Sequence, residues 1–312
     1  MKRVLSVLVF SLAFFAITSA QSLEEATQLY NEGATALNEG NLETALGNFE
    51  KAFAMAKNLG DEGAALAENC KGIIPGIYFT MATNLGKEQK NSEAIEMLKV
   101  TIEKAKEYED EMTELDALDL IPQLYYANGN SLLAEEKFAE AIVEYKGAIE
   151  YDPENGKAYL NMGIAYSRID NEAGMVEALE KAIELGEKAN AERQLSNYFL
   201  KKSNDARAAK KNQESMDYAK KSMDYLDNAQ ANQLYGLAAL QLKKYKEATE
   251  GLEAFIAKSQ GKNLNSMYYQ IATAYEALGN KDKACGYYKR ILDDKQFGEY
   301  AKHKVNNDLK CN

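Results

Sequence analysis

Small residues recur at regular places among large apolar residues along this chain. In residues 138–166, FAEAIVEYKGAIEYDPENGKAYLNMGIAY, the small residues Ala141 and Gly163 each stand about one helical turn before a tyrosine, Tyr145 and Tyr166. Apolar positions follow the spacing i, i+3, i+4 and i+7 of one helix face, and they never alternate with the period of two that a strand requires. The pattern predicts an all-α protein.

Seven copies of one local pattern predict seven pairs of antiparallel helices. In each second helix a small residue precedes a large one by four positions, as Ala141 precedes Tyr145, and each first helix has a small residue at its middle. Antiparallel helices approach to about 8 Å only where such residues lie at the contact. The middle residues are Gly33, Ala82, Gly129, Gly163, Ser203, Gly236 and Ala272, with spacings of 49, 47, 34, 40, 33 and 36 residues.

Helical hairpins repeated in tandem predict an α-solenoid closed by a C-terminal capping helix. One boundary is marked by DPEN, in which Pro153 cannot continue a helix and Asp152 or Asn155 can cap one. We expect the solenoid to cover residues 21–312, with hairpins near 26–59, 64–107, 118–155, 156–189, 192–226, 229–260 and 265–294 and the cap over 297–309.

The recurrent small and aromatic residues carry a family resemblance. They include Gly33, Ala45, Phe49, Ala52, Tyr125, Gly129, Ala141, Tyr145, Ala148, Pro153, Tyr159, Gly163, Tyr166, Leu179, Ala182, Gly236, Ala248, Tyr268, Tyr275, Ala284 and Tyr288. In this pattern the chain resembles the tetratricopeptide repeat family over nearly all of residues 21–312. The resemblance implies a concave groove lined by the first helices of the hairpins, where some members hold the terminal carboxylate of a peptide with Lys and Asn side chains.

The repeat register places five residues of this chain in that groove. Asn130 and Asn161 match two of the family's asparagines, and Lys201 matches a basic residue of a third repeat. Tyr126 and Asn197 stand where the family has lysines. We therefore expect a groove that binds extended peptide backbone, because Asn offers both a donor and an acceptor.

Two departures from the repeat carry structural expectations. The first two intervals exceed the family period of 34 residues, and Pro75 and Pro122 occupy matching positions in these long units. Each should have a first helix with an N-terminal extension that is kinked or interrupted at proline. In the fourth and fifth hairpins Met175, Ser203 and Ser215 replace the expected alanine or glycine, so we expect looser packing there.

The N-terminus has the layout of an export signal. Lys2 and Arg3 precede the apolar run 4–17 and the small residues 18–20, with cleavage expected before Gln21. The run is shorter than the roughly 20 residues of a membrane span, which favours a signal peptide (residues 1–20) over a retained anchor. We expect a periplasmic or secreted bacterial protein without a stable membrane span after cleavage.

Charge and cysteines add expectations about partners. Residues 21–155 carry 27 acidic and 10 basic residues, and residues 156–312 carry 21 acidic and 25 basic ones. This asymmetry disfavours nucleic acid as a ligand and leaves self-association, acidic end to basic end, as one hypothesis. In an oxidising compartment Cys285 and Cys311 can form a disulfide that fixes the C-terminus, with Cys70 left free or buried.

The sequence offers no assembled catalytic site. Its one histidine, His303, excludes a catalytic triad or His-rich metal site, and no phosphate-binding glycine loop is present. The acidic run 107–119 lacks the alternating ligands and central glycine of a calcium loop. We expect no enzyme activity, cofactor or metal. The fifth hairpin has a basic patch, which is either a solvated helix face or a site that binds carboxylates of a partner. Its residues are Lys201, Lys202, Arg207, Lys210 and Lys211.

These observations leave three functions open. The first is an exported scaffold or adaptor that binds a protein or peptide in its groove, in envelope assembly or secretion. The alternative is a glycan- or peptidoglycan-binding or modifying protein, in which some of the 20 tyrosines stack on sugars. The third is an oligomeric structural element.

Overall fold

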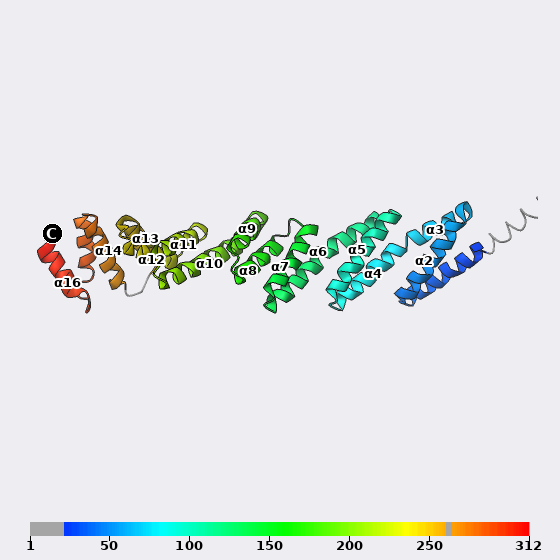
Figure 1. Ribbon diagram of the computed structural model, residues 1–312, viewed down its shortest axis with the longest axis horizontal. Coiled ribbons are helices and arrows are strands. Elements are labelled where there is room, and N and C mark those ends of the chain that lie inside the picture. Colours follow the sequence, from blue (N-terminus) through cyan, green and yellow to red (C-terminus); the bar gives the residue numbers. More distant parts are fainter. Residues whose placement is uncertain (1–21, 260–263, 312) are drawn as a thin grey trace, which may run out of the picture. The chain divides into compact units, whose positions relative to one another are not determined.

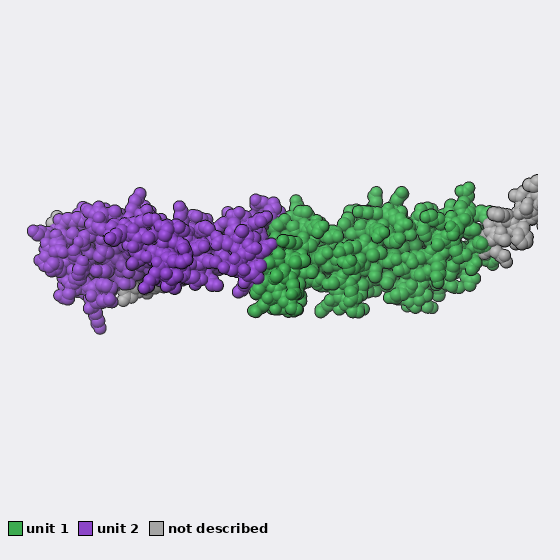
Figure 2. Space-filling view, in the orientation of Figure 1, with its two compact units in different colours: residues 1–165 green, residues 166–312 purple. Residues whose placement is uncertain are grey.

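The chain folds into helices alone in a computed structural model that describes residues 22–259 and 264–311 (Figure 1). No strand occurs within these two ranges, so the all-α solenoid prediction is confirmed. The predicted signal peptide lies outside the described residues. The structure divides into two compact units, residues 1–165 and 166–312 (Figure 2).

Unit 1 is a series of helical hairpins. A helix over residues 22–38 is followed by a set of labelled helices. These are α2 (Leu42–Asn58), the 3₁₀ turn η1 (Gly60–Glu62), α3 (Ala64–Lys71), α4 (Ile74–Lys87), α5 (Asn91–Tyr108), α6 (Glu111–Ala134), α7 (Phe138–Tyr151) and the start of α8 (Gly156–Arg168).

Unit 2 continues the same alternation. It contains α9 (Glu172–Ala182), a π turn η2 (Ile183–Glu187), α10 (Lys188–Ala208), α11 (Asn212–Tyr225), α12 (Ala229–Gln241), α13 (Tyr245–Lys258), α14 (Asn265–Ala277) and α15 (Lys281–Lys289). The chain then forms α16 (Gly298–His303) and the π turn η3 (Lys304–Asp308), where Ala301 and Val305 pack on Tyr288 and Ile291 of the last hairpin.

One turn motif fixes the register of all seven hairpins. In each turn one residue has a left-handed backbone, with φ between 56° and 78°, and it lies seven residues after the small middle residue of the first helix. The next residue donates its N–H to the carbonyl five residues earlier at 2.9–3.0 Å, which ends the helix. The left-handed residues are Gly40, Gln89, Glu136, Asp170, Lys210, Lys243 and Gly279.

Small residues lie where the paired helices cross. A methyl group added to Gly129 of α6 would lie 2.6 Å from the Tyr145 ring of α7, and one added to Gly236 of α12 would lie 2.9 Å from the backbone nitrogen of Leu252 in α13. These distances are shorter than any normal carbon contact. The large residues therefore fill the space that the small ones leave.

The predicted N-terminal extension is present in both long units, but the helix is interrupted before the proline in only one of them. Before Pro75 the helix is interrupted, since α3 ends at Lys71, Gly72 caps it, and α4 begins at Ile74. Pro122 lies inside the continuous 24-residue helix α6. The corresponding position to Gly72 is Asp119, which has no comparable tendency to end a helix.

The expectation of looser packing in the fifth hairpin is wrong. Helices α10 and α11 pair as extensively as α6 and α7. Ser203 Oγ donates to the Ser215 carbonyl at 2.8 Å, and the hydroxyls of Ser196 and Ser222 lie 2.9 Å apart. All four serines are buried, so hydrogen bonds across the interface replace the contact that alanine or glycine would make.

Candidate functional site

Three of the five predicted groove residues meet in unit 1. Asn161 of α8 donates through Nδ2 to Asn130 Oδ1 of α6 at 2.8 Å and to the Tyr126 hydroxyl at 3.2 Å. The hydroxyl of buried Tyr145 in α7 donates to the same Asn130 oxygen at 2.9 Å. Burial raises the pKa of Tyr145 above its usual range, so this donor stays protonated. Three helices thus hold the two amides in fixed orientations, and we call Tyr126, Asn130 and Asn161 the amide cluster.

The amide cluster leaves two polar atoms without a partner among the described residues. Asn130 Nδ2 and Asn161 Oδ1 make no hydrogen bond there, although the other polar atom of each side chain is engaged. Both side chains are partly exposed. One amide therefore offers a donor and the other an acceptor, which are the groups that pair with a peptide bond.

The other two predicted residues, Asn197 and Lys201, lie on α10 in unit 2. Both side chains are exposed. They belong to a different unit from the amide cluster, which lies in unit 1. Among the described residues of unit 2 neither side chain makes a hydrogen bond, whereas neighbours hold the amides of unit 1.

A charged cluster next to Lys201 was missed by the sequence reasoning. Lys202 Nζ pairs with Asp170 at 2.6 Å, and the Tyr198 hydroxyl donates to the same carboxylate at 2.9 Å. The hydrogen bond from Lys202 holds the pKa of Asp170 below its usual range. Lys202 is therefore not free to receive a partner's carboxylate. Only the i, i+4 spacing of Tyr198 and Lys202 was visible in the sequence.

An open hollow of about 730 Å³ lies among helices α10 to α14 of unit 2. Leu237, Ala238 and Leu240 form its apolar part. Arg207 and Lys210, two members of the predicted basic patch, line it and have no ion-pair or hydrogen-bond partner for their side chains in the described part of the chain. We call this surface the basic hollow.

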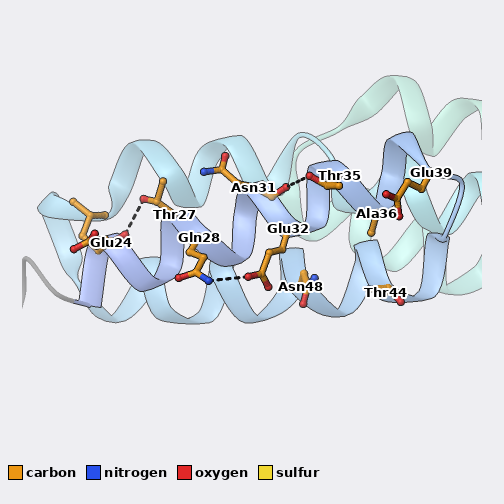
Figure 3. Close-up of a pocket in the computed structure, with 11 residues that line it drawn as sticks. Glu24, Thr27, Gln28, Asn31, Glu32, Thr35, Ala36, Glu39, Thr44 and Asn48 are labelled. Carbon is orange, nitrogen blue, oxygen red and sulfur yellow. Dashed lines mark hydrogen bonds between the residues drawn. The ribbon is translucent and has the colours of Figure 1, made fainter.

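A second hollow, of about 940 Å³, runs along the first helix of unit 1 (Figure 3). Gln28 donates to Glu32 at 2.9 Å, and Thr35 donates to the Asn31 carbonyl at 2.9 Å, so part of the lining is engaged within the first helix. Thr44 and Asn48 of α2 also line the hollow.

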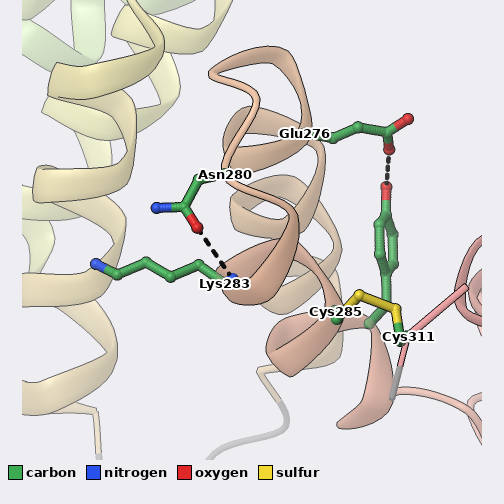
Figure 4. Close-up of a disulfide and its surroundings, with 6 residues drawn as sticks. Glu276, Asn280, Lys283, Cys285 and Cys311 are labelled. Carbon is green, nitrogen blue, oxygen red and sulfur yellow. Dashed lines mark hydrogen bonds between the residues drawn. A yellow bond between two sulfur atoms is a disulfide. The ribbon is translucent and has the colours of Figure 1, made fainter. Parts of the chain in front are cut away.

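The C-terminus is held by a disulfide and by hydrogen bonds to α14 (Figure 4). Cys285 of α15 is bonded to Cys311 beyond η3. Glu276 accepts hydrogen bonds from the Tyr288 hydroxyl at 3.0 Å and from Lys304 Nζ at 2.6 Å. Cys70 is free and buried, and burial raises the pKa of its thiol to about 11.

The described residues assemble no group of His, Cys, Asp and Glu that could hold a metal ion. His303 lies at the surface, where its Nδ1 is 3.5 Å from Asp308. Across residues 22–259 and 264–311, every helix is too short or too polar to cross a bilayer.

Family models match the chain at three places. A TPR repeat model matches residues 129–170, and tetratricopeptide repeat models match residues 156–188 and 266–294. The first match begins at Gly129 and contains Asn130 and Asn161. The chain therefore contains tetratricopeptide repeats. No enzyme family is among these matches, and repeats of this family form scaffolds for protein–protein interaction.

Solved structures resemble this tetratricopeptide repeat protein at low identity. The MamA protein is 22% identical, covering 60% of this chain and 95% of its own, with a TM-score of 0.34. YrrB, described as a TPR protein with an unusual peptide-binding site, is 18% identical over 57% of this chain and 90% of its own, with a TM-score of 0.32. A tetratricopeptide repeat protein from Parabacteroides merdae is 17% identical over 94% of this chain and 100% of its own, with a TM-score of 0.28.

TM-scores below 0.5 do not establish a common arrangement of repeats, so the family assignment rests on the family models and the helical hairpins. No curated protein matches the chain.

Proposed function

We propose that this tetratricopeptide repeat protein is an exported, non-catalytic scaffold that binds an extended segment of a partner protein at the amide cluster. The observation that carries the proposal is the pair of unpartnered atoms, Asn130 Nδ2 and Asn161 Oδ1, on side chains that their other hydrogen bonds already orient. An extended peptide presents an N–H group and a carbonyl group to its receptor. The receptor must supply an acceptor for the N–H group and a donor for the carbonyl group.

Prior orientation of the amides favours binding. Tyr145 and Tyr126 hold the two asparagines before any partner arrives, so little side-chain entropy is lost when the peptide binds. Main-chain recognition does not depend on the partner's side chains. Partner selectivity then comes from the surfaces around the amide cluster.

Two features support a place outside the cytoplasm. Residues 1–20 have the layout of a cleaved export signal. The disulfide between Cys285 and Cys311 is of a kind that persists in oxidising compartments. We therefore assign the scaffold to the periplasm or the secreted fraction, in envelope assembly or secretion.

The burial of the tyrosines disfavours the glycan-binding alternative. Of the 20 tyrosines, only Tyr300 is classed as exposed, at 44%. Tyr145, Tyr275 and Tyr288 belong to the core. The other sixteen tyrosines are partly buried, so each presents only part of its ring to solvent.

The test compares crosslinked capture from an envelope fraction by three proteins: wild type, the double variant Asn130→Ala with Asn161→Ala, and the control Asn69→Ala. Asn69 is an exposed asparagine on α3 of the same unit. Captured proteins are identified by mass spectrometry, and helix content is checked by circular dichroism.

We expect the double variant to lose the partner by at least tenfold, because two net hydrogen bonds contribute about 1 kcal/mol each. The control should retain it. Equal capture by wild type and a folded double variant would show that the partner binds elsewhere.

A further inference from the structure

The first turns of α6 form a segment that the repeat does not require. This helix has 24 residues and α10 has 21, whereas the corresponding first helices α4, α8, α12 and α14 have 13 or 14. The excess lies at the N-terminal end, where Ala117 is buried but the opposite side faces solvent.

Two large apolar side chains project from this segment. Met112 is 76% exposed and Leu115 is 66% exposed, and no other large apolar side chain of the described residues exceeds Met112 in exposure. Their spacing of three residues places them on the same side of the helix. We call residues 111–116 the acidic ridge, for the carboxylates described next.

Carboxylates flank the two apolar residues. Glu111 and Asp116 are exposed, and neither has an ion-pair or hydrogen-bond partner within residues 22–259 and 264–311. The backbone N–H groups of Glu111 and Met112, at the start of the helix, likewise have no acceptor there. The ridge thus combines apolar contact, two free negative charges and free donors.

The basic hollow of unit 2 has the complementary chemistry. Leu237 and Leu240 offer partly exposed apolar surface, and Arg207 and Lys210 offer two positive charges that have no ion-pair partner among the described residues. Gln270 also lines the hollow, and its Oε1 is buried without a hydrogen-bond partner. An incoming N–H donor would satisfy that oxygen.

From this complementarity we infer that the basic hollow of one molecule receives the acidic ridge of a second copy of this chain. Met112 and Leu115 enter the apolar part of the hollow, while Glu111 and Asp116 pair with Arg207 and Lys210. The contact joins two different surfaces, so each molecule keeps one free ridge and one free hollow, and a chain of molecules can grow. It uses none of the residues of the amide cluster.

The test is a charge exchange followed by sedimentation velocity at low salt. Variant one carries Glu111→Lys and Asp116→Lys, and variant two carries Arg207→Glu and Lys210→Glu. The control variant carries Lys220→Glu, which reverses the charge of one exposed lysine of α11 outside the hollow. A further variant, Met112→Ser with Leu115→Ser, removes the apolar contact and leaves the charges.

Wild type and the control should associate at low salt and dissociate as salt rises, because ion pairs at an exposed rim are screened. Each reversed variant should associate at least tenfold more weakly by itself, and an equimolar mixture of the two should associate again. The serine variant should also associate more weakly. The double variant of Asn130 and Asn161 should self-associate like wild type, which separates this inference from the proposed function.

Three outcomes would overturn the inference: wild type that stays monomeric at low salt, reversed variants that associate like wild type, or a mixture that stays monomeric. A monomeric wild type that binds an acidic peptide through Arg207 and Lys210 would assign the hollow to a different partner.

Discussion

The crossing of α12 and α13 gives the sharpest test of how small residues hold the hairpins together. A methyl group on Gly251 would lie 2.8 Å from the Gly236 nitrogen and 2.9 Å from the Asn232 carbonyl oxygen, both backbone atoms of α12. Neither atom can move without moving the helix. Gly286, in α15 of the same unit, would place its methyl group with no atom within 4 Å.

Alanine at Gly251 and alanine at Gly286 should both gain helix propensity, but only the first should also overpack the interface between two helices. Replacing glycine by alanine inside a helix gains about 1 kcal/mol of helix propensity in both. Overpacking costs about 1–3 kcal/mol at Gly251 only. We therefore expect Gly286→Ala to raise the free energy of unfolding by about 1 kcal/mol. Gly251→Ala should lie about 1–3 kcal/mol below that variant.

Urea unfolding followed by circular dichroism measures the difference. With a denaturant slope of about 2–3 kcal/mol/M, the urea midpoint of Gly251→Ala should lie roughly 0.3–1.5 M below that of Gly286→Ala. A Gly251→Ala protein as stable as Gly286→Ala would refute the reasoning, because it would mean that the helices can separate by the width of a methyl group at no cost.

Three further predictions concern the cysteines and tyrosines. Native protein should show no thiol reactive toward Ellman's reagent near pH 8, since burial raises the pKa of Cys70 to about 11, and denatured protein should show one thiol. Reduction should lower the melting temperature, because closing 26 residues stabilises the fold by up to about 3 kcal/mol; a Cys285→Ser, Cys311→Ser variant should be insensitive to reductant. Tyr78, Tyr198 and Tyr225 have pKa values raised to about 12, mainly by burial. Their contribution to the free energy of unfolding is complete below pH 10 and falls as the pH rises toward 12. Absorbance at 295 nm should show that these tyrosines ionise at a higher pH than free tyrosine.

The helical hairpins were predictable because local spacing determines them. The small residues Gly129 and Gly163 mark helix middles, and the left-handed turns follow at a constant distance. The interruption before Pro75 lies at Gly72 and Ile73, immediately before the proline, so it is also local. Pro122 shows the limit of the proline signal, because a helix can continue through proline when the residues before it favour helix.

Contacts between distant residues were less predictable. Asn130 and Asn161 came from the repeat register, but their partner Tyr145 had only a packing role in the sequence reasoning. The pair of Lys202 with Asp170 joins a helix to a turn 32 residues earlier. The free atoms of the amide cluster could not be foreseen either, because the sequence does not show which amide atom a neighbour already uses.

The buried serines of α10 and α11 bear on how a chain of similar repeats avoids pairing wrongly. Crossings made by alanine and glycine carry no side-chain hydrogen bond, so a wrong pairing of helices there would leave no polar side chain unsatisfied. The hydroxyl contacts of Ser203 with Ser215 and of Ser196 with Ser222 require matched partners at both positions. A mispaired or slipped neighbour would leave buried hydroxyls without hydrogen bonds, each costing about 1–3 kcal/mol. These two hydroxyl contacts therefore favour the pairing of α10 with α11 over the pairing of either helix with a helix of another repeat.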